Sequence, residues 1–169
     1  MKKIYEYNGF SFHEYNPTIF RPFYVNLEPI SMRKRLRFLL AYFAGYKVYY
    51  MAKDDEYIGY CVVENGRDIR YKFATNKDIL VGPYFVKEDY RGRKLSVMLL
   101  EVILHNIGLR YNYAWDYIKK TNIPSIKASS KVGLSYFSDA TISSITRQLV
   151  LLQDNKGDYC IMRYKNIKA

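Results

Sequence analysis

The stretch that decides the fold lies near the middle of the chain and reads Val86-Lys87-Glu88-Asp89-Tyr90-Arg91-Gly92-Arg93-Lys94-Leu95-Ser96. It follows an apolar run over 78–86, typical of a buried strand, and it precedes a pattern over 94–107 with apolar residues on one helical face. A helix start offers unpaired N–H groups and the positive end of the helix dipole, which suit a phosphate. Arg91, Arg93 and Lys94 fall within four residues, and Gly92 lets the backbone approach a ligand closely. We therefore expect a pyrophosphate-binding loop here, with a solvated basic loop as the alternative.

The strand before this loop contains Gly82-Pro83. Proline has no N–H to donate to a neighbouring strand, so a central strand that carries it must bulge or separate from its neighbour at that point.

A second informative segment begins at Asn122-Ile123-Pro124-Ser125 and ends at Lys131-Val132-Gly133-Leu134. Asn is a favoured N-cap, Pro is tolerated in the first turn of a helix, and Gly commonly follows the last turn. The segment predicts a short helix capped by Asn122.

Together the two segments resemble motifs A and B of the Gcn5-related N-acetyltransferase superfamily (GNAT). Motif A is a strand, loop and helix in which Arg or Gln leads into a glycine-rich turn, and Arg91 matches its first position. Motif B is a helix that begins with Asn and ends in Gly-Phe. The resemblance covers about 78–134 well and the flanks only by the order of elements. It implies a single acyl-CoA N-acyltransferase domain over 1–169, of class α+β, with a mixed and mostly antiparallel central sheet, splayed middle strands and flanking helices.

The resemblance also implies acetyl-CoA as co-substrate, and no metal. In the family, the strand before the loop separates from the next strand and binds pantetheine by its backbone, the loop binds the pyrophosphate, and the motif B Asn contacts pantetheine. Carried over, the implied cofactor-binding residues are Phe85, Val86, Arg91, Gly92, Arg93, Lys94, Leu95, Ser96, Asn122 and Ser125.

Three positions depart from the family pattern. Lys94 and Ser96 stand where the family has glycines, so we expect both to take ordinary negative φ and cofactor binding to be weaker or differently posed. Many members place a Tyr acid seven residues after the motif B Asn, where this chain has Ser129. The catalytic candidates are therefore Ser129, as a hydrogen-bond donor, and Tyr136, the nearest phenol beyond the helix.

Composition limits the class of protein. The chain has 169 residues, 49% apolar and 25% charged, which suits one globular domain. Its net charge of +11 favours anionic partners. The apolar runs are too short for a membrane span, and we see no signal peptide after Met1. Cys61 and Cys160 lie in apolar runs, without the spacing of a zinc site, and we expect buried thiols in a reducing cytoplasm.

The flanks predict further elements. Asn8-Gly9 predicts a hairpin, and a helix from Ser31 to Ala44 is expected to bury Met32, Leu36, Leu39, Leu40 and Phe43 and to leave its basic residues in solvent. Strands are expected over 46–53, 57–64, 68–74 and 111–118, and over 145–153 and 158–165, joined by Asp154-Asn155-Lys156-Gly157.

These features lead to one main hypothesis for function, a cytoplasmic acetyl-CoA-dependent N-acetyltransferase that acts on a small primary amine. Exposed aromatic residues around Phe20, Phe23, Tyr24 and Tyr42 suggest an amino sugar as the first candidate acceptor, and a peptide or protein amine as the second. A domain that binds acyl-CoA with weak catalysis is an alternative, and a homodimer is left open. Binding of single-stranded nucleic acid is disfavoured, because the aromatic residues are spread along the whole chain.

Overall fold

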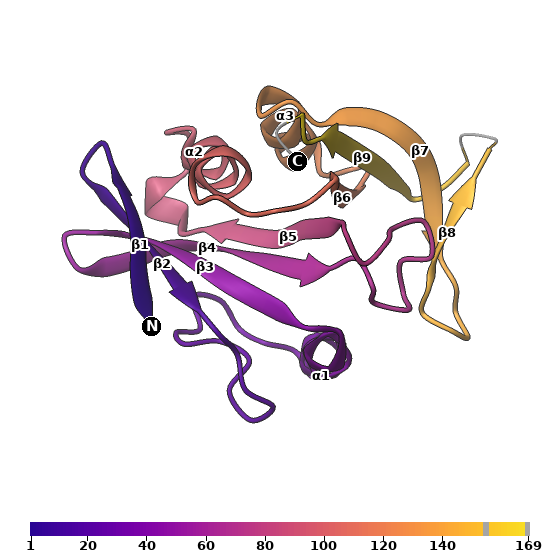
Figure 1. The fold of residues 1–169 in the computed structure, drawn as a ribbon, viewed down its shortest axis with the longest axis horizontal. Helices are drawn as coiled ribbons and strands as arrows, with labels where there is room; N and C mark the ends of the chain where they lie inside the picture. Colours follow the sequence, from indigo (N-terminus) through magenta and orange to yellow (C-terminus); the bar gives the residue numbers. More distant parts are fainter. Residues whose placement is uncertain (154–155, 168–169) are drawn as a thin grey trace. The chain divides into compact units, whose positions relative to one another are not determined.

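The computed structural model describes residues 1–153 and 156–167. The chain divides into two compact units, the first formed by Met1–Glu64 and Gly82–Leu109 and the second by Asn65–Val81 and Arg110–Ala169. Over the described residues, the strands form a nine-stranded mixed sheet in the order β1-β2-β3-β4-β5-β6-β9-β7-β8, and three α-helices accompany it (Figure 1). The α+β class expected from the sequence is confirmed.

The first unit begins with four consecutive antiparallel strands, which are β1 Lys2–Tyr7, β2 Phe10–Tyr15, β3 Tyr46–Lys53 and β4 Glu56–Asn65. The predicted hairpin is confirmed, with φ of 51° at Asn8 and 76° at Gly9. A second tight turn joins β3 to β4, with positive φ at Asp54 and Asp55. Asn, Asp and Gly tolerate this left-handed backbone better than other residues, which is why these short sequences specify both turns.

Helix α1, Met32–Ala44, has the predicted ends, but the face that it turns toward the core is not the predicted one. Ser31 accepts a hydrogen bond from the Lys34 amide, and Gly45 ends the helix with φ of 89°. Phe38 and Ala41 are buried, whereas the five apolar residues expected in the core are exposed: Met32, Leu36, Leu39, Leu40 and Phe43. That prediction is wrong because Lys34 and Arg37 point inward, where each one pairs with a carboxylate of the same unit.

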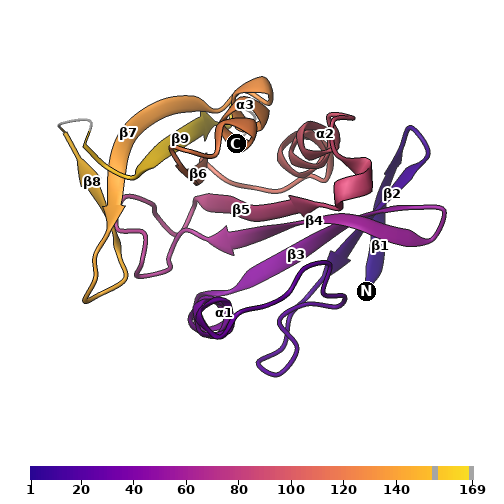
Figure 2. The ribbon, with the colours of Figure 1, turned by 180° about the vertical axis from the view of Figure 1, so that it is seen from behind.

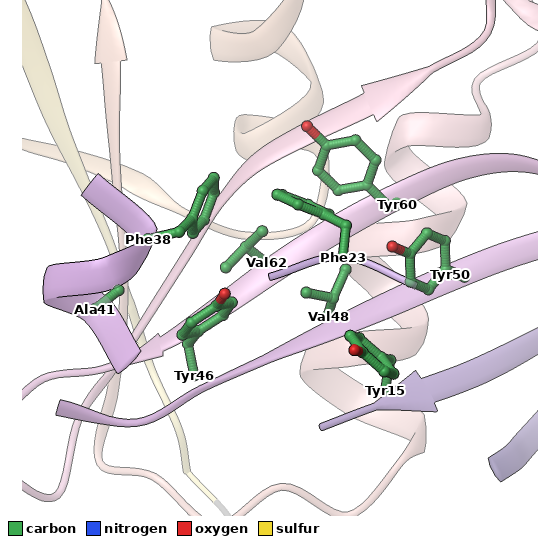
Figure 3. Close-up of a cluster of buried hydrophobic side chains, with 9 residues drawn as sticks. All are labelled: Tyr15, Phe23, Phe38, Ala41, Tyr46, Val48, Tyr50, Tyr60 and Val62. Carbon is green, nitrogen blue, oxygen red and sulfur yellow. The ribbon is translucent and has the colours of Figure 1, made fainter. Parts of the chain in front are cut away.

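Aromatic residues dominate the core beneath α1. Figure 3 shows the side chains of Tyr15, Phe23, Phe38, Ala41, Tyr46, Val48, Tyr50, Tyr60 and Val62 gathered into one cluster. The ring of Phe23 meets those of Phe38 and Tyr60 edge-on, with centroids 4.8 and 5.1 Å apart. Such edge-to-face pairs add to the free energy gained from burial, and they fix the loop before α1 against β4.

The motif A segment contains β5 Ile79–Val86, a short 3-10 turn over Glu88–Tyr90 and helix α2 Leu95–Glu101. A π-helical turn over Val102–Asn106 continues α2. This helix buries the face that the sequence predicts, including Leu95, Leu99 and Ile103. Within the first unit, α2 and α1 lie on opposite sides of the sheet (Figures 1 and 2).

The second unit contains β6 Tyr113–Lys119, α3 Ile123–Lys131, β7 Ser135–Ile142, β8 Leu149–Leu152 and β9 Tyr159–Lys165. Strand β9 lies between β6 and β7 and is antiparallel to both, and β8 pairs with β7. The sequence analysis did not anticipate β7. The strand expected over 68–74 is absent, because the chain there forms turns around the buried ion pair of Asp68 and Arg70. Asp154 and Asn155, part of the turn predicted between the last two strands, lie outside the described residues.

Trp115 of β6 is the only tryptophan in the sequence, and it is buried in the core of the second unit. The Arg163 guanidinium on β9 lies 5.5 Å from the centre of its ring and 4.4 Å from that of Phe137. The two cysteines, Cys61 and Cys160, are buried free thiols, and burial raises the pKa of Cys160. None of the helices in the described part of the chain is long and apolar enough to cross a membrane.

Candidate functional site

The predicted phosphate loop leaves β5 where this strand lies close against β4. The Lys87 amide donates a hydrogen bond to the Ile58 carbonyl at 2.8 Å. At Gly59, an added Cβ would lie 2.9 Å from the Phe85 carbonyl oxygen, a distance too short for any side chain. Gly59 is thus required for the approach of the two backbones, and it holds Phe85 and Val86 at the mouth of the loop.

Contacts to neighbouring residues orient the cations of this loop. Arg91 donates from Nε to the Val86 carbonyl at 3.2 Å, and its guanidinium lies 5.6 Å from the centre of the Phe85 ring. Arg93 lies over the ring of Tyr90, whose hydroxyl donates to Glu56 at 3.0 Å. Arg91, Gly92, Arg93 and Lys94 are all exposed. Their positive charge is therefore accessible to an anion, although Nη1 of Arg91 also lies 3.7 Å from Glu88 in an exposed ion pair.

The backbone conformation of Lys94 differs from the ordinary negative φ that the sequence analysis expected. Its φ is 58° and its ψ is 21°, so a lysine adopts the left-handed conformation that glycine takes most easily. For a residue with a Cβ this conformation costs roughly 1 kcal/mol. The loop thus keeps a glycine-like backbone at Lys94, whereas Ser96 lies inside α2 as expected. Lys94 makes no capping hydrogen bond within the described residues, so its side chain does not satisfy the first N–H groups of α2.

At the start of α3, Asn122 is the predicted N-cap. Its Oδ1 accepts a hydrogen bond from the Ser125 amide at 3.4 Å, and Asn122 is exposed while Ser125 is half-buried. The structure therefore brings these two predicted cofactor-binding residues together in the second unit. Their role toward a cofactor stays a prediction.

The two catalytic candidates lie in different surroundings within the second unit. Ser129 is 0% exposed and donates to Asp116 at 2.7 Å. Tyr136 is 56% exposed, and its hydroxyl donates to Asp139 at 3.1 Å. Partial burial and this hydrogen bond raise the pKa of Tyr136, so the phenol keeps its proton at neutral pH. Lys120 donates to the other oxygen of Asp139, which lowers the pKa of that carboxyl.

The sequence analysis missed a polar cluster on the α1 side of the first unit. Lys34 donates from Nζ to Glu28 at 2.7 Å and to the Tyr60 hydroxyl at 2.9 Å, and Tyr60 in turn donates to Glu28. Burial and the hydrogen bond to Glu28 raise the pKa of Tyr60, which keeps it a neutral phenol. No local pattern joins these residues, because Glu28 and Tyr60 are 32 positions apart.

Comparison with known proteins depends on structure alone, since no family model and no curated protein matches the sequence. A putative acetyltransferase from Acinetobacter baylyi superposes with a TM-score of 0.58 at 14% identity, covering 93% of this chain and 94% of that one. An aminoglycoside acetyltransferase in complex with coenzyme A gives a TM-score of 0.59 at 12% identity, covering 76% of this chain and 70% of that one. The fold is that of the Gcn5-related N-acetyltransferases.

A third structure extends the agreement. A putative acetyltransferase from Salmonella typhimurium, solved with acetyl-CoA, has a TM-score of 0.55 at 15% identity, covering 81% of this chain and 74% of that one. The GNAT resemblance read from the two motifs is thereby confirmed at the level of the fold. The roles of individual residues of this GNAT fold remain predictions.

Proposed function

We propose that the chain is an acetyl-CoA-dependent N-acetyltransferase, one domain over 1–169, that transfers the acetyl group directly to a primary amine of a small molecule. The observation that carries this proposal is the set of exposed cations at the start of α2. Arg91, Arg93 and Lys94 lie between the short 3-10 turn that follows β5 and the start of α2, in a chain that has the GNAT fold. Guanidinium groups bind phosphate oxygens through paired hydrogen bonds, and the first N–H groups of α2 add to the positive potential.

The strand before the loop supports the same proposal. Strand β5 pairs in parallel with β6 at Ile79 and Leu80, and Gly82 follows with φ of 116°. The backbone groups of Phe85 and Val86, beyond that pairing, would bind the amides of pantetheine as an added strand does. The pyrophosphate would then meet the residues from Arg91 to Ser96, and Asn122 and Ser125 are the proposed contacts from α3.

Acetyl transfer needs two proton transfers besides the exchange of bonds. The amine nitrogen attacks the thioester carbonyl, a C–N bond forms, and the C–S bond breaks to release the thiolate of CoA. A base takes the proton from the nitrogen, and the thiolate gains one from an acid. We favour Tyr136 over Ser129 as this acid, because the Tyr136 phenol is exposed and protonated whereas Ser129 is enclosed and donates to Asp116.

For the acceptor we propose an amino sugar first and a peptide amine second. Phe20 is 95% exposed, and Tyr24 and Tyr42 are partly exposed, so these rings are available to stack on a sugar. Phe23, expected with them, is buried in the core cluster and takes no part in such a surface. The aminoglycoside acetyltransferase with this fold acts, by its name, on amine-bearing sugars.

Calorimetry with CoA tests the cofactor site directly. We expect binding to the wild type that weakens as salt rises, because exposed ionic contacts are screened. Arg91→Ala should weaken binding further, whereas Lys72→Ala, an exposed cation in the second unit, should leave it unchanged. A wild type that gives no heat and no thermal shift at millimolar CoA would end the proposal.

Thiol release with a panel of amines and amino sugars tests the acid. If Tyr136 protonates the thiolate, Tyr136→Phe should slow turnover on the order of a hundredfold. Ser129→Ala, checked for folding by circular dichroism, should then be nearly silent. Full activity in both variants would mean that solvent protonates the thiolate and that neither residue is the acid.

A further inference from the structure

The polar cluster missed by the sequence analysis surrounds a primary ammonium group. The Nζ of Lys34 lies 2.7 Å from a Glu28 oxygen, 2.9 Å from the Tyr60 hydroxyl and 5.9 and 5.6 Å from the ring centres of Phe23 and Tyr60. A carboxylate and a phenol oxygen accept hydrogen bonds from an alkylammonium ion, and an aromatic ring such as that of Phe23 can add a cation–π contact. Tyr60 contributes its hydroxyl oxygen, because Nζ lies beyond that oxygen and not over the ring. We call Glu28, Tyr60 and Phe23 the ammonium cage.

Contacts within the first unit connect this cage to the phosphate loop. The ring of Tyr60 stacks on that of Phe85, with centroids 6.1 Å apart and an interplanar angle of 25°. The Phe85 ring is also in contact with the Arg91 guanidinium, which lies 5.6 Å from its centre. A series of side-chain contacts thus connects Arg91, the proposed pyrophosphate-binding residue, through Phe85 of the proposed pantetheine-binding strand to Tyr60 of the ammonium cage.

The cage is also reachable from solvent. The side chains of Lys34 and Glu28 are 19% and 31% exposed, whereas Glu64, the other carboxylate beneath α1, is 1% exposed and pairs with Arg37. A structural ion pair that ties the loop before α1 to β4 would need no opening to solvent. The partial exposure of Lys34 and Glu28 therefore favours a binding site over a purely structural pair.

We propose that the ammonium cage is the site of the acceptor's amine, an inference that rests on the proposed acetyltransferase function. An acceptor ammonium replaces the Nζ of Lys34 beside Glu28, the Tyr60 hydroxyl and the Phe23 ring, and it gives one proton to Glu28. The neutral nitrogen then attacks the thioester carbonyl, the C–N bond forms, and the C–S bond breaks to release the CoA thiolate. The acetylated nitrogen loses its second proton to solvent, and the thiolate gains a proton from the acid proposed above, so that CoA leaves as its thiol. Tyr60, hydrogen-bonded to Glu28, positions the carboxylate. Lys34 competes with the acceptor for the cage.

Lys34→Ala tests this proposal, because it removes the side chain beyond Cβ and leaves room for n-propylammonium. Binding of n-propylammonium is measured first, without CoA, as a rise in the Tm of the Lys34→Ala protein. We expect a rise with n-propylammonium but not with 1-propanol, and none in the double variant Lys34→Ala, Glu28→Gln. Arg35→Ala, the exposed neighbour on α1, is the matched control and should resemble the wild type.

Thiol release from acetyl-CoA is measured next, with n-propylamine as acceptor. We expect Lys34→Ala to acetylate it faster than the wild type does, since the competing amine is gone. Suppose that the variant shows a rise in Tm with n-propylammonium and still binds CoA by calorimetry, yet releases no thiol. That result would overturn the acceptor site and leave the proposed acetyltransferase function standing. Absence of any Tm rise would overturn it as well. A chain that does not bind CoA at all would refute the proposed function, and the acceptor site with it.

A second variant keeps the proposal testable if Lys34→Ala does not fold. Glu28→Gln preserves the size of the side chain and its hydrogen bond from Lys34. We expect it to raise KM for an amine substrate about tenfold, the factor that corresponds to 1.4 kcal/mol, with an unchanged Kd for CoA. An unchanged KM would exclude Glu28 from the acceptor site.

Discussion

Helices α1 and α2 lie on opposite sides of the sheet of the first unit, yet they meet it by different means (Figure 2). Helix α2 buries a continuous apolar face that includes Leu95 and Leu99. Among the described side chains of helix α1, only Phe38 and Ala41 are fully buried, Lys34 and Arg37 are directed toward carboxylates, and all three leucines are exposed. An apolar face alone therefore does not determine which side of a helix packs inward. Carboxylates beneath the helix that pair with its cations can decide it.

The sharpest test of this contrast is one substitution made in both helices. Leu99 on α2 is 0% exposed and Leu36 on α1 is 58% exposed. Leu99→Ala should lower the free energy of unfolding by about 3 kcal/mol, through lost burial and the cavity that remains. Leu36→Ala should change it by less than about 0.5 kcal/mol. Urea unfolding measures both, and equal losses would show that α1 buries its leucines after all.

The second test removes the cation that orients α1. Arg37 pairs with Glu64 at 2.8 Å, and Arg37→Met would leave a buried carboxylate without this partner. We expect a loss of about 2 kcal/mol, less than for a fully buried pair because Arg37 is partly exposed. Arg35→Met, on the exposed side, is the control and should be nearly neutral. Adding Glu64→Leu to Arg37→Met should recover part of the stability, and no recovery would argue against the ion pair as the cause.

The smallest expected effect lies where α2 begins. Lys94→Gly should raise the free energy of unfolding by about 0.5 kcal/mol, since glycine relieves the left-handed strain but costs some chain entropy. It should also weaken CoA binding if the charge of Lys94 contributes. Lys94→Asn separates the two effects, because Asn tolerates the same backbone without the charge. A Lys94→Gly protein less stable than the wild type would contradict the strain at this position.

Local chemistry explains which parts of the structure could be predicted. The hairpin at Asn8-Gly9, the ends of α1 and the cap at Asn122 each depend on a few adjacent residues, and all are confirmed. The orientation of α1 depends on Glu28 and on Glu64, which follows Arg37 by 27 positions, and no helical periodicity contains that information. Strand β7 was missed because its residues, Ser135–Ile142, alternate weakly and pair with β9, the last strand of the chain.

The same distinction applies to the candidate site, where features set by adjacent residues could be predicted and features set by the tertiary structure could not. The cations of the loop could be read from the sequence because they are adjacent, and the fold they implied is confirmed. The left-handed backbone of Lys94 could not be predicted from the sequence, because a lysine seldom adopts positive φ and only the surrounding turn imposes it. The ammonium cage combines residues from the loop before α1 with a residue of β4, so it could be recognised only from the tertiary structure.

The position of Trp115 has a practical consequence for these experiments. Because it is the only tryptophan of the chain and is buried in the second unit, indole emission is an optical label for that unit alone. Variants of α1 and α2 alter the first unit, which has tyrosines but no tryptophan. A fluorescence transition that coincides with the loss of far-ultraviolet circular dichroism would show the two units unfolding as one cooperative system. Separated transitions would show that the second unit, which the fluorescence reports, unfolds apart from the first.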